Sequence, residues 1–229
     1  MSYASSRALS ISNSTHHSFW LAYLTHWGIT FTAAYMVMSV ISFVYLAKRP
    51  PANRSTLEGG VGLLVKSTWA LCATAIPMEL LITILFWVLE FDGTVRYVSV
   101  MVHGGATILI MIDAFVLSRM PLRVKQFILS ELVAILYILW TVVHAYSGLG
   151  NPYVDTDEDK TDDAIYSTLA WKNNTTTAAI VSLGVVFIAN PIIFLFCRAL
   201  SRILPRRLCE VSDEQGSTKL HDEEAVVVY

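Results

Sequence analysis

The chain has 229 residues, of which 55% are hydrophobic and 15% are charged, and its mean hydropathy is +0.55. A soluble domain has about 45–50% apolar and about 25% charged residues, so this composition indicates a membrane protein without a second, soluble domain. The net charge of −2 argues against nucleic acid as a partner.

The N-terminal residues 1–17 are polar and lack the apolar core of a cleavable signal peptide. We expect them to form a polar luminal tail. The first apolar segment, which follows them, is then expected to act as an uncleaved signal-anchor.

Five apolar stretches are long enough to cross a bilayer, which takes about 20 residues in a helix. They are residues 18–47, 63–91, 98–117, 124–148 and 177–200. In a bilayer core, backbone groups must pair within helices or closed barrels. The sequence therefore predicts an all-α, polytopic transmembrane bundle of about five helices over 18–200, followed by a disordered tail at 201–229. Asn190-Pro191 is expected to break the fifth helix near its middle.

Lysine and arginine are unevenly divided between the two sets of loops that five spans create. The side that includes the N-terminus has four of the sixteen: Arg7, Arg96, Lys160 and Lys172. The positive-inside rule then predicts an outside or luminal N-terminus and a cytosolic C-terminus, in the endoplasmic reticulum or the plasma membrane. Glycosylation sequons at Asn13, Asn173 and Asn174 fall on the luminal side, which supports this orientation, whereas the sequon at Asn53 falls on the cytosolic side and is expected to stay unmodified.

Residues 155–163 contain six carboxylates, which we interpret as a solvated loop. A calcium loop is the alternative, although the Gly and final Glu of an EF-hand are missing. Cys72, Cys197 and Cys209 lie in membrane or cytosolic segments, so we expect no structural disulfide. Cys197 and Cys209 are candidate palmitoylation sites.

Ionisable side chains inside spans are costly, so each one is a functional hypothesis. At a rise of about 1.5 Å per residue, Thr25 and His103 lie at nearly equal depth, roughly 10 Å below the luminal surface. His26 shares this level, and His144 and Glu90 lie nearer the surface.

A second set of ionisable residues lies deeper: Glu79, Asp113 and Glu131. For both sets the simplest interpretation is hydrogen bonding between helices, worth about 1 kcal/mol or less for each bond. For Asp113 and Glu131 the alternatives are a shared proton or ion pairs with the nearby Arg119 and Lys125. A haem is the cofactor alternative, and His26, His103 and His144 would allow one haem at most because two ligands must face each other. We expect no cofactor.

Three short elements resemble the rolling stone family, which is related to the androgen-induced family of multi-span membrane proteins. They are AYLTHWG at 22–28, VHGGATILIMID at 102–113 and IYSTLAW at 165–171. The first contains Thr25. The second contains His103-Gly104 near its beginning and ends at Asp113. In the third, Ser167 and Ala170 stand where family members tend to have proline and an acidic residue.

The androgen-induced resemblance implies an intramembrane hydrolase of fatty acid esters of hydroxy fatty acids, with a Thr nucleophile and a His base. These roles fall on Thr25 and His103, with His26, Asp113 and His144 as candidate supporting residues. The chemistry agrees, because a Thr hydroxyl is a weak nucleophile until a base takes its proton. Membrane lipids are the expected partners. The alternative is a non-enzymatic, rolling stone-like protein of cell–cell interaction or fusion, in which Thr25 and His103 only tie helices together.

Overall fold

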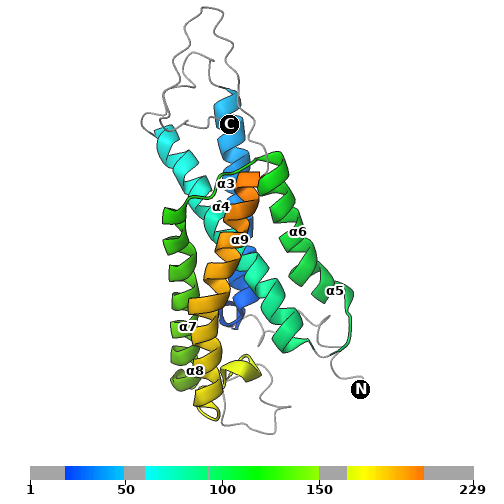
Figure 1. The fold of residues 1–229 in the computed structure, drawn as a ribbon, viewed down its shortest axis with the longest axis vertical. Helices are drawn as coiled ribbons and strands as arrows, with labels where there is room; N and C mark the ends of the chain where they lie inside the picture. The colour runs from blue at the N-terminus through cyan, green and yellow to red at the C-terminus, as the bar shows by residue number, and fades with distance from the viewer. Residues whose placement is uncertain (1–18, 49–59, 92, 150–163, 204–229) are drawn as a thin grey trace, which may run out of the picture.

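The computed structural model describes residues 19–48, 60–91, 93–149 and 164–203. Within these residues all regular structure is helical (Figure 1). Asn13, Cys209, the acidic loop at 155–163 and residues 204–229 lie outside the described residues.

The helices form five long segments, several of them built from consecutive α-helical and π-helical pieces. The first is α3 (Leu24–Ala47), which follows the 3-10 turn η1 (Trp20–Ala22), and the second is α4 (Gly60–Leu85) with the π-helix η3 (Phe86–Glu90). The third contains α5 (Tyr97–Val100), η4 (Met101–Gly105), α6 (Ala106–Met111) and η5 (Ile112–Leu117). The fourth is η6 (Val124–Gln126) with α7 (Phe127–Ser147). After η7 (Ser167–Leu169), the fifth contains α8 (Thr175–Gly184), η8 (Val185–Ala189) and α9 (Asn190–Ile203).

All five segments are long and apolar enough to cross a membrane. Their candidate spans are Leu24–Tyr45, Gly62–Glu90, Tyr97–Leu117, Val124–Ser147 and Thr175–Ile203. The predicted all-α bundle of about five spanning helices is therefore confirmed.

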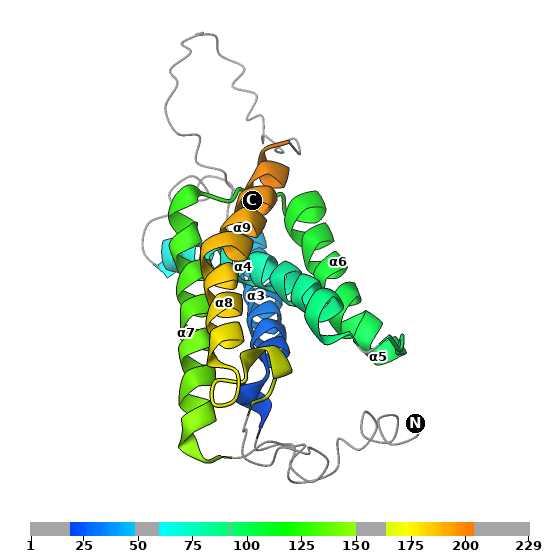
Figure 2. The same ribbon diagram turned by 60° about the horizontal axis from the view of Figure 1, so that its bottom comes forward.

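The second segment lies at the centre of the bundle. α4 crosses diagonally between α7 and α6 (Figures 1 and 2) and packs against α3, α6, α7 and α9. In the most apolar 18-residue stretch of the second segment, 56% of the residues are buried. In the corresponding stretch of the first segment, 17% are buried. The outer helices turn apolar side chains such as Phe43 and Phe187 outward, where they are 74% and 71% exposed. Such a surface is suited to surrounding lipid.

The fifth helix passes the Asn190-Pro191 step without breaking, which corrects the predicted break. Pro191 has no N–H to donate, and the π-helical turn η8 lies immediately before this step. There the Asn190 N–H donates to the Val185 carbonyl, five residues back. The wider turn absorbs the irregularity that proline introduces, so the helix continues.

Close packing of α3 on α4 depends on a glycine and on polar contacts. The Thr32 hydroxyl donates to Glu79 Oε1 at 2.8 Å, and the hydroxyls of Ser42 and Thr68 are 2.8 Å apart. A Cβ atom on Gly28 would lie 3.1 Å from Glu79 Oε1. Glu79 is thus enclosed between the two helices, with only 2% of its surface exposed.

Candidate functional site

A cavity lies between α4, α7, the fifth segment and the first turn of α3. Including its open part, it measures about 830 Å³. Its body is aliphatic and includes Met78, Leu81, Ile82, Leu85, Val133, Ala134, Ile138, Val181 and Val185. Polar side chains gather at one end, here called the outer end: Thr25, Glu90, His103, Tyr137, Tyr166 and Thr168. Ser130 and Asn190 line the opposite, inner end.

Thr25 lies in the first turn of α3, and Tyr166 packs against this turn. The Leu24 N–H donates to the Tyr166 hydroxyl at 3.2 Å, and the Thr25 side chain is a second hydrogen-bonding neighbour of that hydroxyl. Close by, the Tyr137 hydroxyl donates to the Ala22 carbonyl at 2.9 Å. The start of α3, the middle of α7 and the segment before α8 therefore meet around Thr25.

Tyr166 lies outside the five spans, in the segment that leads to α8. Burial raises the pKa of Tyr166 to about 12, although the hydrogen bonds from Thr25 and Leu24 act in the opposite direction. The phenol therefore keeps its proton at neutral pH. In that state its oxygen accepts from Leu24 while its O–H remains a donor.

His103 lies in the π-helical turn η4 and lines the same cavity. Its ring stacks on Phe86, with centroids 3.7 Å apart and an angle of 11° between the planes. Its backbone carbonyl accepts from Trp87 Nε1 at 3.4 Å. Nδ1 of His103 is buried and has no hydrogen-bond partner among the described residues. Stacking thus fixes the ring without engaging this nitrogen.

The structure brings the predicted nucleophile and base to one cavity. Thr25 and His103 both line its outer end, where the depth estimate places them. Their immediate contacts differ, since Thr25 adjoins Tyr166 and His103 stacks on Phe86. Among the described residues no direct hydrogen bond links Thr25 to His103, and what the two share is the cavity that both line. Their catalytic roles stay predictions.

A carboxylate also belongs to the outer end. Glu90 ends η3, and its Oε1 accepts from the Thr168 hydroxyl at 3.2 Å. Sequence reasoning placed Glu90 near the surface but gave no role to it, to Tyr137, to Tyr166 or to Thr168. Tyr166 and Thr168 both lie in IYSTLAW, and their presence in that element was the signal available from the sequence.

The other histidines have different surroundings. His26 contacts the Trp20 carbonyl through Nδ1 at 2.7 Å and stacks on the Trp20 ring at 3.7 Å. His144 is buried and lines a second, smaller cavity together with Trp140 and Thr141. Including its open part, this second cavity measures about 250 Å³. The haem alternative would need two of the histidines to face each other, but His103 and His144 line different cavities. In the part of the chain that the structure describes, no group of three or more His, Cys, Asp or Glu is arranged to hold a metal ion.

The deep acids bond to neutral side chains of other helices. Asp113, the third candidate supporting residue, accepts from the Tyr35 hydroxyl. Glu131 Oε2 accepts from Asn190 Nδ2 at 2.7 Å, and Asn190 Oδ1 accepts from the Ser130 hydroxyl at 3.0 Å. These contacts fit the interpretation of the deep set as ties between helices.

Two of the three glycosylation candidates can be located. Asn173 and Asn174 are exposed just before α8, and Asn174 Oδ1 accepts from the Thr177 N–H at 3.3 Å as the N-cap of that helix. Their glycosylation stays a prediction, as does the luminal position of this end of the bundle.

Five membrane-length helices with an apolar outer surface define a multi-pass helical membrane protein. The family model for protein rolling stone matches residues 9–215, so the chain belongs to the rolling stone family. It is similar to protein rolling stone of Drosophila melanogaster, with 24% identity over 165 residues. This match covers 66% of the chain and 56% of the Drosophila protein, so the chain spans little more than half of that relative. No solved structure matches the chain.

Proposed function

We propose that the protein is an intramembrane lipid ester hydrolase in which Thr25 is the nucleophile and His103 is the general base. One observation supports this proposal above the others. Thr25 and His103 line the polar outer end of a cavity whose body is aliphatic. The resemblance to the androgen-induced family suggests fatty acid esters of hydroxy fatty acids as the substrate class.

The cavity suits a lipid whose ester lies at the outer end and whose acyl chain fills the body. Tyr137 and Ser130 lie on the same helix near opposite ends of the cavity. At about 1.5 Å per residue, this part of α7 gives the body a length of roughly 10 Å. Burial of an acyl chain there stabilises the complex by about 25 cal/mol per Å² of apolar surface. The reacting ester is thereby held near Thr25 and His103.

The proposed reaction has two steps, acylation of Thr25 and hydrolysis of the acyl-threonine. His103 takes the Thr25 proton as Oγ1 attacks the ester carbonyl, and a tetrahedral oxyanion forms. The ester C–O bond then breaks, and the leaving alcohol takes the proton from the imidazolium. In the second step His103 deprotonates a water that attacks the acyl-threonine, which releases the fatty acid and restores Thr25. The neutral Tyr166 hydroxyl, next to Thr25, is suited to donate to the oxyanion.

Release of fatty acid by the purified full-length protein tests the proposal. With a synthetic fatty acid ester of a hydroxy fatty acid, we expect Thr25→Val and His103→Gln to lower the rate by about 10²–10⁴, the usual contribution of a general base. Thr25→Ser should retain activity because it keeps the hydroxyl. Thr30→Val is the matched control, since the exposed Thr30 hydroxyl donates to the carbonyl of His26 in its own helix, at 2.7 Å, and Thr30 does not line the cavity.

Covalent labelling gives a second measurement. A lipid phosphonate should add its mass to the peptide that contains Thr25 in the wild type and not in Thr25→Val. Wild-type turnover by a folded Thr25→Val protein would refute the proposal. It would favour the non-enzymatic alternative, in which Thr25 and His103 have structural roles alone.

A further inference from the structure

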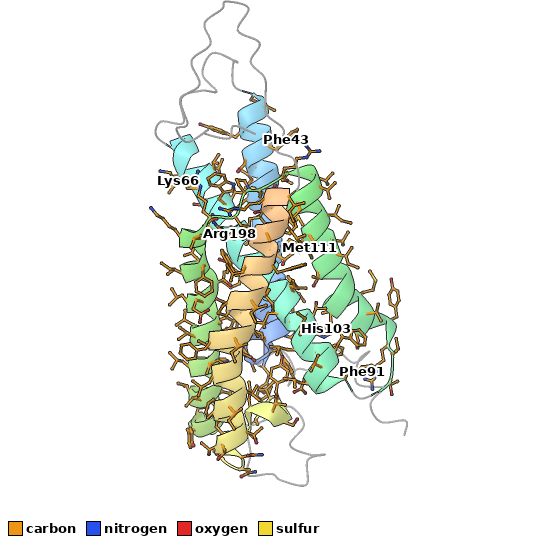
Figure 3. All side chains as sticks on the ribbon, viewed as in Figure 1. Phe43, Lys66, Phe91, His103, Met111 and Arg198 are labelled. Carbon is orange, nitrogen blue, oxygen red and sulfur yellow. The ribbon has the colours of Figure 1, made fainter. Side chains whose placement is uncertain are left out.

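The end of the bundle opposite the outer end carries a group of nitrogen donors. It lies where α4 and α7 begin and α9 ends, and Figure 3 shows Lys66 and Arg198 there, far from His103. The group, here called the basic cluster, consists of Lys66 and Trp69 on α4, Arg123 at the start of η6, and Arg198 on α9. None of its members lines the cavity described above.

Arg123 contacts α4, and its neighbour Leu122 contacts α9. Its guanidinium carbon lies 4.9 Å from the centroid of the Trp69 ring. Its chain neighbour Leu122 donates its N–H to the Ser201 hydroxyl at 3.2 Å. Lys66 lies one helical turn before Trp69, so it shares the helix face that Arg123 covers.

Arg198 faces the same region from α9. It lies one turn after Phe194, whose ring meets Phe127 edge-on with centroids 5.4 Å apart. Residues one turn apart share a helix face, so Arg198 faces the beginning of α7. Arg123 directly precedes η6, so both arginines belong to the end of the bundle where α7 begins.

Two donors of the basic cluster are buried and unsatisfied. Arg198 Nε and Trp69 Nε1 have no hydrogen-bond partner among the described residues. Buried donors are nearly always paired, because an unpaired one loses its water without compensation. All four side chains donate, and none has a good acceptor, so the partner they suit is an anion with several acceptor oxygens.

The carboxylates near the basic cluster that the structure describes have other partners. Glu131, one turn beyond Phe127, accepts from Asn190 at 2.7 Å. Asp113 lies in η5, at the end of the third segment, and accepts from the Tyr35 hydroxyl. Among the described residues, therefore, no carboxylate is seen to neutralise the positive charge of the basic cluster, which suits the cluster to bind an external anion.

We propose that the basic cluster binds the phosphate-bearing headgroup of an anionic phospholipid. The guanidinium groups suit bidentate contacts to phosphate, and exposed Lys66 adds a point charge. Ile128 and Leu132 follow along α7 and are 68% and 50% exposed, so they supply apolar surface beside the headgroup for acyl chains. A soluble anion would leave that surface unused. The loop charges predict that this end is cytosolic, the side on which anionic lipids are concentrated.

Native mass spectrometry of the delipidated full-length protein tests the proposal. We expect the protein in detergent to bind one molecule of dioctanoyl phosphatidylinositol 4,5-bisphosphate more tightly than dioctanoyl phosphatidylcholine. Arg198→Gln should weaken this binding by about tenfold, since it removes a charge-assisted contact. Lys172→Gln also removes one positive charge, but from an exposed site at the other end, and it should leave binding unchanged.

A second variant keeps the test decisive if Arg198→Gln does not fold. Trp69→Phe preserves an aromatic face under Arg123 and removes only the unpaired N–H, so we expect about threefold weaker binding. Thermal unfolding without lipid verifies the fold of each variant. Unchanged binding by folded Arg198→Gln or Trp69→Phe would overturn the proposal, and so would equal weakening by Lys172→Gln. Equally tight binding of inositol 1,4,5-trisphosphate would assign the site to a soluble anion instead.

Discussion

The Leu24 N–H donates a hydrogen bond to the Tyr166 hydroxyl at 3.2 Å, across 142 residues of sequence. Leu24 is the first residue of α3, where backbone N–H groups have no partner inside the helix. Tyr166 therefore acts as a side-chain cap supplied by another part of the chain. The same contact places the segment before α8 beside Thr25, at the positive end of the α3 dipole.

Tyr166→Phe removes this cap and keeps the ring. We expect a loss of about 1 kcal/mol of stability, or a fall of about 2–4 °C in Tm for a protein of this size. If the phenol also donates to the oxyanion, kcat for the lipid ester should fall by about 10²–10³ with little change in KM. Thermal unfolding and steady-state kinetics measure the two effects.

Tyr146→Phe is the control for the loss of a phenol at the same end. Its exposed hydroxyl donates to the Trp171 carbonyl at 3.4 Å, away from Thr25. Both its Tm and its kcat should remain close to wild type. A Tyr166→Phe protein with lowered Tm and unchanged kcat would restrict Tyr166 to the cap.

The ionisation of Tyr166 predicts a dependence of stability on pH. Its pKa of about 12 in the folded protein lies above the ordinary value of 10.0, because burial disfavours the phenolate. The neutral phenol therefore contributes to the stability of the folded state. This contribution is fully present below pH 10 and is lost as the pH rises toward about 12. In ultraviolet titrations, the difference between wild type and Tyr166→Phe should be one tyrosine that ionises near pH 12. A difference centred near pH 10 would show that this phenol is solvated.

Gly28 allows the close approach of α3 and α4. A Cβ there would lie 2.5 Å from Ile82 Cδ1 and 3.1 Å from Glu79 Oε1. Ile82 lines the cavity and its terminal carbon has room to shift, so we expect Gly28→Ala to cost about 1 kcal/mol, the low end for overpacking. Gly104→Ala is the matched control, because nothing lies within 4 Å of its Cβ position. It should gain up to about 1 kcal/mol from helix propensity, and a similar loss in both variants would contradict this account.

The helices were predictable because bilayer thickness imposes a length and a composition that the sequence displays directly. That Thr25 and His103 lie at the same end of the bundle was also predictable, since the level of a residue follows from its position along its helix. The direction in which a side chain points around its helix axis is set by packing, and it does not follow from depth. Consequently His26, which follows Thr25 directly, stacks on Trp20 and does not line the cavity.

Other features of the site depend on distant packing. Tyr166 reaches Thr25 through a connection that has no periodic pattern, so its position could not be inferred from depth. The turn at Val185–Ala189 keeps the fifth helix continuous past Pro191, whereas local proline chemistry alone favours a break. Asp113 and Glu131 could be recognised from the sequence as acids inside the spans, but their partners Tyr35 and Asn190 emerge only from the way the helices pack.

Ala134 allows a test of whether an acyl chain occupies the cavity. It lines the aliphatic body on α7, between the levels of Ser130 and Tyr137, and its small side chain leaves space there. A phenyl ring at this position would fill part of the body without touching Thr25 or His103. For Ala134→Phe we expect kcat/KM for a long-chain ester to fall by about tenfold or more. Several methylenes of the acyl chain would no longer be buried in the cavity, and each buried methylene contributes about 0.8 kcal/mol to binding. Hydrolysis of a short acetyl ester should continue at nearly the wild-type rate.

Leu136→Phe is the control for this substitution, because Leu136 lies on the same helix and is 46% exposed on its outer surface. It should leave the chain-length preference unchanged. An equal loss for short and long esters in Ala134→Phe would indicate distortion of the outer end, and thermal unfolding would reveal it. An unchanged preference in a stable Ala134→Phe protein would mean that the acyl chain lies outside the cavity. The substrate would then have to reach Thr25 from the surrounding lipid without entering the bundle.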